Sequence, residues 1–147
     1  MNAETLMTKD IHTCRTIDTL DRVAELMRDH GIGTVPVVDA QGRVVGMITD
    51  RAICMATLAQ DAPPRAISVE LSMSPHPLTC SRTDDISLVE ERMCQRQLHR
   101  MPVVDDDGHP IGLISVDDLA RAARDGALTA EEVTNTLAAV TAHRSLY

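Results

Sequence analysis

Ser115 and Asp118 stand where an apolar segment gives way to a helical pattern, with two residues between them. An aspartate one turn into a helix can accept hydrogen bonds from two vicinal hydroxyl groups, and the free N–H groups at the helix N-terminus favour a phosphate. The same spacing also fits a capping box, which serves only to close the helix start. The pair therefore predicts either a ligand site or a structural cap. Thr129 and Glu132 repeat the spacing outside any repeated motif, and there we expect only a cap.

Basic residues precede the apolar segment that leads to this pair. His99 and Arg100 stand directly before it. At the start of a strand such a pair could contact a phosphate, whereas on an ordinary surface it is simply solvated. Arg51 and Lys9 are further cationic candidates, for which a solvated side chain is the simpler interpretation.

The segment that carries these residues occurs twice in the chain. Residues 4–53 align with residues 70–119 without a gap, and 15 of the 50 aligned pairs are identical. Such an ungapped match indicates a duplicated structural unit. The polar residues differ between the copies: Thr49 aligns with Ser115, but Ala52 stands where the second copy has Asp118.

The capping and turn residues of each copy, together with its apolar pattern, predict a helix followed by a hairpin. Behind Asp18 and Asp84, the expected N-caps, apolar residues recur at helical spacing, and Gly31 is a plausible stop in the first copy. The runs TVPVVD and RMPVVD predict strands, and a turn with glycine leads from each to a partner strand.

Further elements complete each copy. The partner strands end at Thr49 and Ser115, where a second helix opens, and IHTCRTI and PLTCSRT predict one short strand apiece. A helical turn, AETLM or SVELSM, precedes each copy. The order per copy is thus β-α-β-β-α.

Composition excludes several kinds of partner. The net charge of −8 and the scattered basic residues disfavour nucleic acid and anionic membranes, and the lack of Phe and Trp removes aromatic stacking. No run approaches a membrane span, and MNAETLMTKD lacks the apolar stretch of a secretion signal, so we expect a cytoplasmic protein.

The four cysteines predict reduced thiols. No C-x-x-C spacing is present. Cys14 and Cys80 do occupy equivalent positions, which leaves open a bridge between them, or a metal bound with His12 or His76.

At this point the doubled pattern resembles a known family. A hydrophobic-Pro-Val-Val-Asp strand, a turn with glycine, then Gly-hydrophobic-Ile-Thr/Ser leading into a helix is similar to the cystathionine-β-synthase (CBS) domain, here as the tandem pair called a Bateman module, over about residues 3 to 124. The resemblance implies an α/β (α+β) fold of two β-α-β-β-α repeats packed with pseudo-twofold symmetry. The expected parts are repeat 1 at 1–58, a linker at 59–68, repeat 2 at 69–125 and a C-terminal helix at 126–147.

The resemblance also implies a ligand. CBS pairs bind adenosine-containing molecules such as AMP, ADP, ATP or S-adenosylmethionine in clefts between the repeats, and an aspartate of a Gly-hydrophobic-x-Thr/Ser-x-x-Asp motif holds the ribose. This motif is complete from Gly112 to Asp118, but its first copy has Ala52 in place of the carboxylate. His99 and Arg100 resemble a pair that contacts phosphate in the regulatory subunit of the AMP-activated protein kinase. At the equivalent positions of the first repeat, this chain has Gly33 and Thr34.

The expected ligand-binding residues combine these motifs with core positions that could line an adenine slot and with backbone groups of two threonines. They are Ser115, Asp118, His99, Arg100, Thr79, Ile114, Met101, Thr13, Thr49 and Arg51.

The sequence therefore predicts a non-catalytic regulatory or sensor module, with no catalytic residues, no metal ligands and no required cofactor. Its expected partners are a small adenosyl ligand, a second copy of the chain in a homodimer, and an unidentified protein. One alternative is a structural dimer with degenerate, non-binding clefts; another is a metal or redox sensor built on Cys14 and Cys80.

The apolar stripe of Val133, Leu137 and Val140 within residues 129–144 predicts a helix that packs on the chain's own core or forms a seam between subunits.

Overall fold

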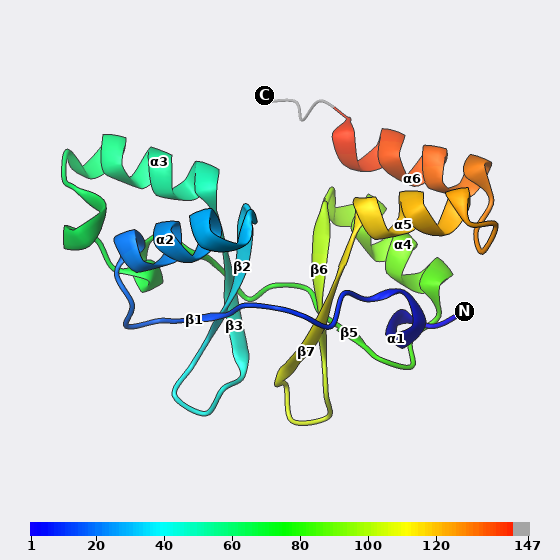
Figure 1. Ribbon diagram of the computed structural model, residues 1–147, viewed down its shortest axis with the longest axis horizontal. Coiled ribbons are helices and arrows are strands. Elements are labelled where there is room, and N and C mark those ends of the chain that lie inside the picture. Colours follow the sequence, from blue (N-terminus) through cyan, green and yellow to red (C-terminus); the bar gives the residue numbers. More distant parts are fainter. Residues whose placement is uncertain (143–147) are drawn as a thin grey trace. The chain divides into compact units, whose positions relative to one another are not determined.

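Two separate sheets carry the fold in the computed structural model, which describes residues 1–142 (Figure 1). The first-repeat unit comprises His12–Pro77 together with the turn Asp107–Pro110. The second-repeat unit comprises Met1–Ile11, Leu78–Asp106 and the described chain from Ile111 onward. Both units mix helices with strands, as the α/β prediction requires.

The first-repeat unit holds a four-stranded sheet. Its order is β1-β2-β3-β4, with β1 parallel to β2 and the other neighbours antiparallel. Its elements are β1 (Cys14–Arg15), α2 (Leu20–His30), β2 (Thr34–Val38), β3 (Val44–Thr49), α3 (Asp50–Gln60), the 3-10 turns η1 (Pro64–Ala66) and η2 (Val69–Leu71), and β4 (Ser74–Pro75).

The second-repeat unit holds a three-stranded sheet in the order β5-β6-β7, with β5 parallel to β6. Its elements are α1 (Ala3–Leu6), β5 (Cys80–Ser81), α4 (Ile86–Arg96), β6 (Arg100–Val104), β7 (Pro110–Ser115), α5 (Val116–Arg124) and α6 (Ala130–Thr141). The β-α-β-β-α order predicted for each repeat is confirmed. Among the described residues, no helix combines the length and apolar character needed to cross a membrane.

The predicted caps of the first helix in each repeat were wrong by one residue. Thr19 and Asp85 precede the helices, not Asp18 and Asp84. The two aspartates instead accept hydrogen bonds from the backbone N–H three residues earlier, at 2.8 Å for Asp18 and 3.0 Å for Asp84. They therefore hold the turn between the short strand and the helix.

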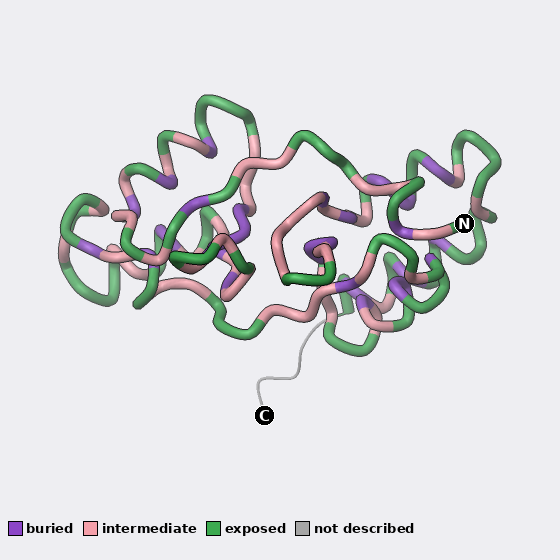
Figure 2. The backbone as a smooth tube through the Cα atoms, turned by 90° about the horizontal axis from the view of Figure 1, so that it is seen from below, coloured by how far each residue is buried: buried purple, intermediate pink, exposed green. Residues whose placement is uncertain are grey.

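Each unit has its own apolar core, filled by branched aliphatic side chains and methionine. In Figure 2 buried and exposed stretches alternate along the helices, as expected for elements with one face against a sheet. The largest fully buried side chains are Leu20, Ile48, Ile67, Ile86, Met93, Met101, Ile114, Leu119, Val23, Val35, Val37 and Val69.

The leading segment of each repeat packs in the unit of the other repeat. Thr8 pairs with Leu113 of β7, with N···O distances of 2.8 and 3.0 Å. In the first-repeat unit Ser74 pairs with Met47 of β3. Ser74 is the repeat equivalent of Thr8, and Met47 is the repeat equivalent of Leu113, so the two pairs are equivalent. The outer edge of each hairpin therefore pairs with residues of the other repeat: with strand β4 in the first-repeat unit and with the single residue Thr8 in the second.

A close approach at two glycines seats these exchanged segments. A Cβ atom on Gly112 would lie 2.4 Å from Sδ of Met7, and a Cβ on Gly46 would lie 2.4 Å from Sδ of Met73. Both glycines are buried. The glycine of the repeated motif thus leaves room for a methionine of the incoming segment.

The C-terminal helix α6 packs on the second-repeat unit, in contact with α4 and α5. Val133 and Val140 join the core of that unit, while Leu137 remains 42% exposed. The predicted stripe thus faces the chain's own core through two of its three members. The end of the predicted helix at Arg144 lies outside the described residues.

A buried carboxylate lies between α4 and α6. Glu90 is 8% exposed, and its Oε1 accepts a hydrogen bond from Oγ1 of Thr136 at 3.0 Å. Burial raises the pKa of Glu90, the Thr136 hydrogen bond opposes that rise, and the charge of nearby Glu132 adds to it. The fold therefore favours the protonated form of Glu90.

We expect Glu90→Gln to stabilise the protein at neutral pH. The pKa of Glu90 is higher in the folded state than in the unfolded state. Protonated Glu90 therefore contributes fully to stability below its unfolded-state pKa of about 4.3, and this contribution is lost as the pH rises through its folded-state pKa. Glutamine keeps an acceptor for Thr136 without the charge, so the variant should gain on the order of 1 kcal/mol at pH 7.5 and almost nothing at pH 4. Urea unfolding at both pH values measures this. Glu91→Gln, on the exposed side of α4, is the matched control, and an equal gain from it would contradict the assignment.

Candidate functional site

The candidate site is built around the start of α5, where Asp118 sits in the first helical turn. Ser115 is the N-cap, and its Oγ accepts from the Asp118 N–H at 3.2 Å. In return Oδ2 of Asp118 accepts from the N–H and the Oγ of Ser115, at 2.8 and 2.9 Å. The capping box foreseen from the spacing is therefore present.

The other carboxylate oxygen of Asp118 has two partners from elsewhere. Oδ1 accepts from Oγ1 of Thr8 at 3.2 Å and from Nη2 of Arg121 at 2.6 Å. The carboxylate is 7% exposed, while the Arg121 side chain is 56% exposed. Asp118 is thus a buried anion held by four donors, at a helix N-terminus whose dipole favours negative charge.

Neither Thr8 nor Arg121 was among the predicted site residues. Arg121 follows Asp118 by three positions, a spacing that places the two side chains on one helix face, so the sequence did contain a signal for this ion pair. Thr8 carried no such signal, because it reaches the site only through the exchange of leading segments.

The structure brings His99 and Arg100 to the same end of the second-repeat unit. The carbonyl of His99 accepts from the N–H of Val116, the first residue of α5, at 3.0 Å. Arg100 opens β6, and both side chains are exposed. The backbone of His99 therefore adjoins the start of the helix that carries Asp118.

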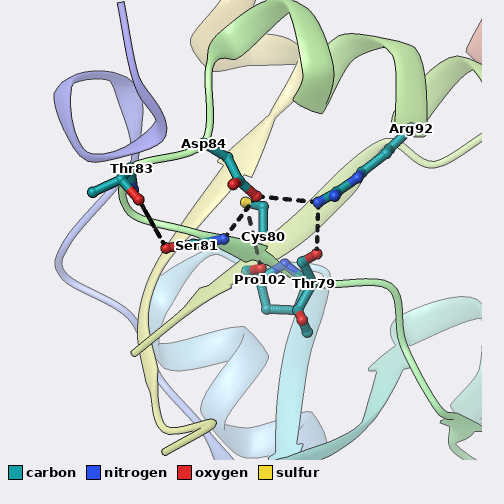
Figure 3. A network of polar contacts seen from close by, with 7 residues as sticks. All are labelled: Thr79, Cys80, Ser81, Thr83, Asp84, Arg92 and Pro102. Atoms are coloured by element: carbon teal, nitrogen blue, oxygen red, sulfur yellow. Dashed lines mark hydrogen bonds and ion pairs between the residues drawn. The ribbon is translucent and has the colours of Figure 1, made fainter. Parts of the chain in front are cut away.

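Thr79 is held by a polar network in the same unit (Figure 3). Nη1 of Arg92 donates to the Thr79 carbonyl at 3.4 Å and to Oδ2 of Asp84 at 3.1 Å. The Asp84 carboxylate also accepts from the Ser81 N–H at 3.0 Å. The Thr79 carbonyl thus has Arg92 as one partner, and the expected adenine contact of the Thr79 backbone stays a prediction.

Met101 and Ile114 are fully buried members of the second-repeat core. Both are 0% exposed, so neither lines an open surface in this structure. Their expected secondary role beside an adenine stays a prediction.

The two repeats match the family model for the CBS domain at residues 3–58 and 67–125. The chain belongs to the CBS domain family. The resemblance of the sequence to a pair of CBS domains is therefore confirmed.

Relatives of this CBS-domain pair include proteins of similar and of greater length. It is 32% identical to the CBS domain-containing protein YhcV of Bacillus subtilis, over 78% of this chain and 79% of that protein. It is 28% identical to the uncharacterized protein MK0525 of Methanopyrus kandleri, over 76% of this chain but only 57% of that one.

A solved structure shares the fold at a similar level of identity. The CBS domain pair of protein MJ0100, in complex with 5′-methylthioadenosine and S-adenosyl-L-methionine, superposes with a TM-score of 0.73 and 25% identity. The match covers 82% of this chain and 98% of that one.

The corresponding place in the first CBS repeat lacks the carboxylate. Thr49 caps α3, and its Oγ1 accepts from the Ala52 N–H at 3.1 Å, as Ser115 does for Asp118. Arg51 is exposed, and its N–H donates to Oδ1 of Asp50 at 2.8 Å. Thr13 is exposed immediately before β1. These three predicted residues belong to the first-repeat unit, whereas the other seven belong to the second.

The cysteines give little support to a redox or thiolate-metal role. All four are free, and Cys14 and Cys80 are buried. Burial, with a smaller effect of Asp18, raises the pKa of Cys14 to about 12. Burial likewise raises the pKa of Cys80 to about 11, with Asp84 adding to the rise and Arg92 opposing it. Both thiols therefore stay protonated at neutral pH, and the thiolate is the form that reacts or binds metal.

One group of metal-ligand side chains within residues 1–142 was not expected. Asp105, Asp107 and His109 lie in the turn between β6 and β7, with ligand atoms within 4.8 Å of one another. Nε2 of His109 is also 2.9 Å from the carbonyl oxygen of Gln41. The alternating Asp-x-Asp-x-His spacing in the turn was the available signal.

Proposed function

We propose that this CBS-domain pair is a non-catalytic regulatory module that binds one adenosine-containing ligand per chain, AMP, ADP, ATP or S-adenosylmethionine. The observation that carries the proposal is the buried Asp118 carboxylate at the start of α5, beside His99 and Arg100. A carboxylate accepts well from a ribose diol, and the guanidinium of Arg100 suits a phosphate or a carboxylate tail. The adenosyl ligands of the MJ0100 pair support this choice of ligand class.

The difference between the repeats supports a single site per chain. Ala52 stands where the second repeat has Asp118, and Gly33 and Thr34 stand where it has His99 and Arg100. The first repeat therefore lacks both the diol acceptor and the His-Arg pair. We also propose a cytoplasmic location, with which four free thiols are compatible.

Thermal unfolding with a panel of ligands tests this function. AMP, ADP, ATP and S-adenosylmethionine are compared with CMP, which carries the same ribose phosphate on another base. A ligand at 100 times its Kd should stabilise the fold by about 2.7 kcal/mol, whereas CMP should shift the midpoint little. If none of the adenosyl ligands shifts the midpoint, the module is a structural dimer with non-binding clefts.

We also propose that the chain forms a homodimer through α3. Leu58 is 75% exposed and Met55 is 44% exposed on this helix, which is a large apolar exposure for one helix face. Equilibrium sedimentation should give twice the mass of one chain, and Leu58→Glu should return the protein to the monomer. A Leu58→Glu variant that stays dimeric would exclude α3 as the interface.

A further inference from the structure

We propose that Thr8 competes with the bound ribose for the Asp118 carboxylate, so that the exchanged leading segment senses whether the site is occupied. This inference rests on the proposed function, because it concerns the ligand expected at Asp118. It adds to that function a residue outside the predicted site and a route by which occupancy changes the fold.

The first step is the acceptor capacity of Asp118. A carboxylate offers about four lone-pair positions. All four are in use: Oδ2 accepts twice from Ser115, and Oδ1 accepts from Thr8 and Arg121. A vicinal diol brings two further donors, so two of the present donors must leave before both ribose hydroxyls can bind.

The second step is which donors leave. Ser115 is the helix N-cap, and its two bonds to Oδ2 are part of the capping box that closes the start of α5. Thr8 and Arg121 both donate to Oδ1. Both residues are exposed, so the Thr8 hydroxyl and the Arg121 guanidinium can hydrogen-bond to water instead. The Thr8 bond, at 3.2 Å, is the longest of the four. The diol therefore displaces the two donors on Oδ1, including the Thr8 hydroxyl.

The third step is what this does to the leading segment. Thr8 is tied to the unit by its backbone pair with Leu113 and by its side chain to Asp118. Ligand binding removes the second tie and leaves the first. By linkage, a tie that the ligand must break lowers the affinity, and cutting that tie beforehand raises it.

The first repeat supplies a matched position without the carboxylate. Ser74 pairs with Met47 in the same register in which Thr8 pairs with Leu113. Ala52 replaces Asp118 there, so the Ser74 hydroxyl has no equivalent acceptor. A substitution at Ser74 therefore changes an exchanged strand without touching the proposed competition.

The test compares Thr8→Val, Thr8→Ser and Ser74→Ala by calorimetric titration with AMP and with 2′,3′-dideoxy-AMP. Thr8→Val should bind AMP about two- to tenfold more tightly than the wild type, because one competing hydrogen bond is gone. Thr8→Ser and Ser74→Ala should match the wild type. The gain from Thr8→Val should vanish with the dideoxy ligand, which has no diol to replace the hydroxyl.

A second readout follows the segment directly. In the wild type, AMP should speed hydrogen exchange at the paired amides of Thr8 and Leu113, whereas Thr8→Val should show no such response. If the wild type binds AMP and Thr8→Val binds it equally or more weakly, the competition is overturned while the proposed function stands. If the wild type binds none of the adenosyl ligands, both fail.

Discussion

Asp118→Ala is expected to weaken AMP binding about ten- to a hundredfold, the largest loss for any single side chain of the site. The carboxylate is the charged acceptor for the ribose hydroxyls, and we take the net loss of these hydrogen bonds as roughly 1.5 to 3 kcal/mol. The substitution also gives the second repeat the residue that the first repeat already has at position 52. Calorimetric titration of the wild type and the variant measures the change.

The same substitution removes a capping box, so its effect on binding must be separated from its effect on the helix. The variant keeps the bond from its N–H at position 118 to the Ser115 N-cap but loses the two return bonds from Ser115 to the carboxylate. Thr129 and Glu132 form another capping box at the start of α6, outside the motif. Glu132→Ala should therefore break a capping box and leave the AMP affinity unchanged. An Asp118→Ala protein that binds AMP as tightly as the wild type would rule out the ribose role.

The order of elements was predictable because the duplication repeats strong local signals. Proline and β-branched residues define the strands, and Gly42 and Gly108 take the positive φ that their turns require, at 79° and 85°. The caps were off by one residue for a local reason. Aspartate side chains bind nearby backbone N–H groups in turns as readily as at helix starts, and Asp18 and Asp84 do the former.

The exchange of leading segments was beyond reach of the sequence. Because the two copies are alike, the segment around Met7 fits β3 by its pattern as well as it fits β7, and only the folded chain shows which hairpin receives it. This is why Thr8 was missing from the predicted site although Ser115 and Asp118 were in it. Local spacing brings Ser115 and Asp118 together, whereas Thr8 arrives from 110 residues away.

The same limit applies to the expected adenine contacts. Apolar periodicity correctly indicated that Met101 and Ile114 face the interior, and both are fully buried. Periodicity carries no information on which buried residue borders a ligand. The bond from Arg92 to the Thr79 carbonyl could not be read from the repeat either, because Arg92 aligns with Leu26 in the first repeat.

Gly112→Ala is expected to destabilise the second-repeat unit by about 1 to 3 kcal/mol, the usual cost of forcing an extra carbon into a packed site. The new Cβ would lie 2.4 Å from Sδ and 2.8 Å from Cγ of Met7, so the methionine must move. Met7 is the neighbour of Thr8 in the exchanged segment. When Met7 moves, the pairing of Thr8 with Leu113 should therefore weaken as well. Denaturant unfolding measures the loss, and Gly46→Ala should show a similar one against Met73.

A double-mutant cycle identifies Met7 as the cause. If the clash with this side chain destabilises Gly112→Ala, then shortening it in Met7→Ala should recover part of the loss, and the double variant should be more stable than the sum of the two single effects predicts by more than about 0.5 kcal/mol. A purely additive pair would mean that the glycine is required for another reason, such as the local flexibility of β7. Met73→Ala combined with Gly112→Ala is the control, because Met73 fills the equivalent place in the first-repeat unit and touches Gly46 instead. That pair should be additive, since Met73 belongs to the other unit and packs against Gly46.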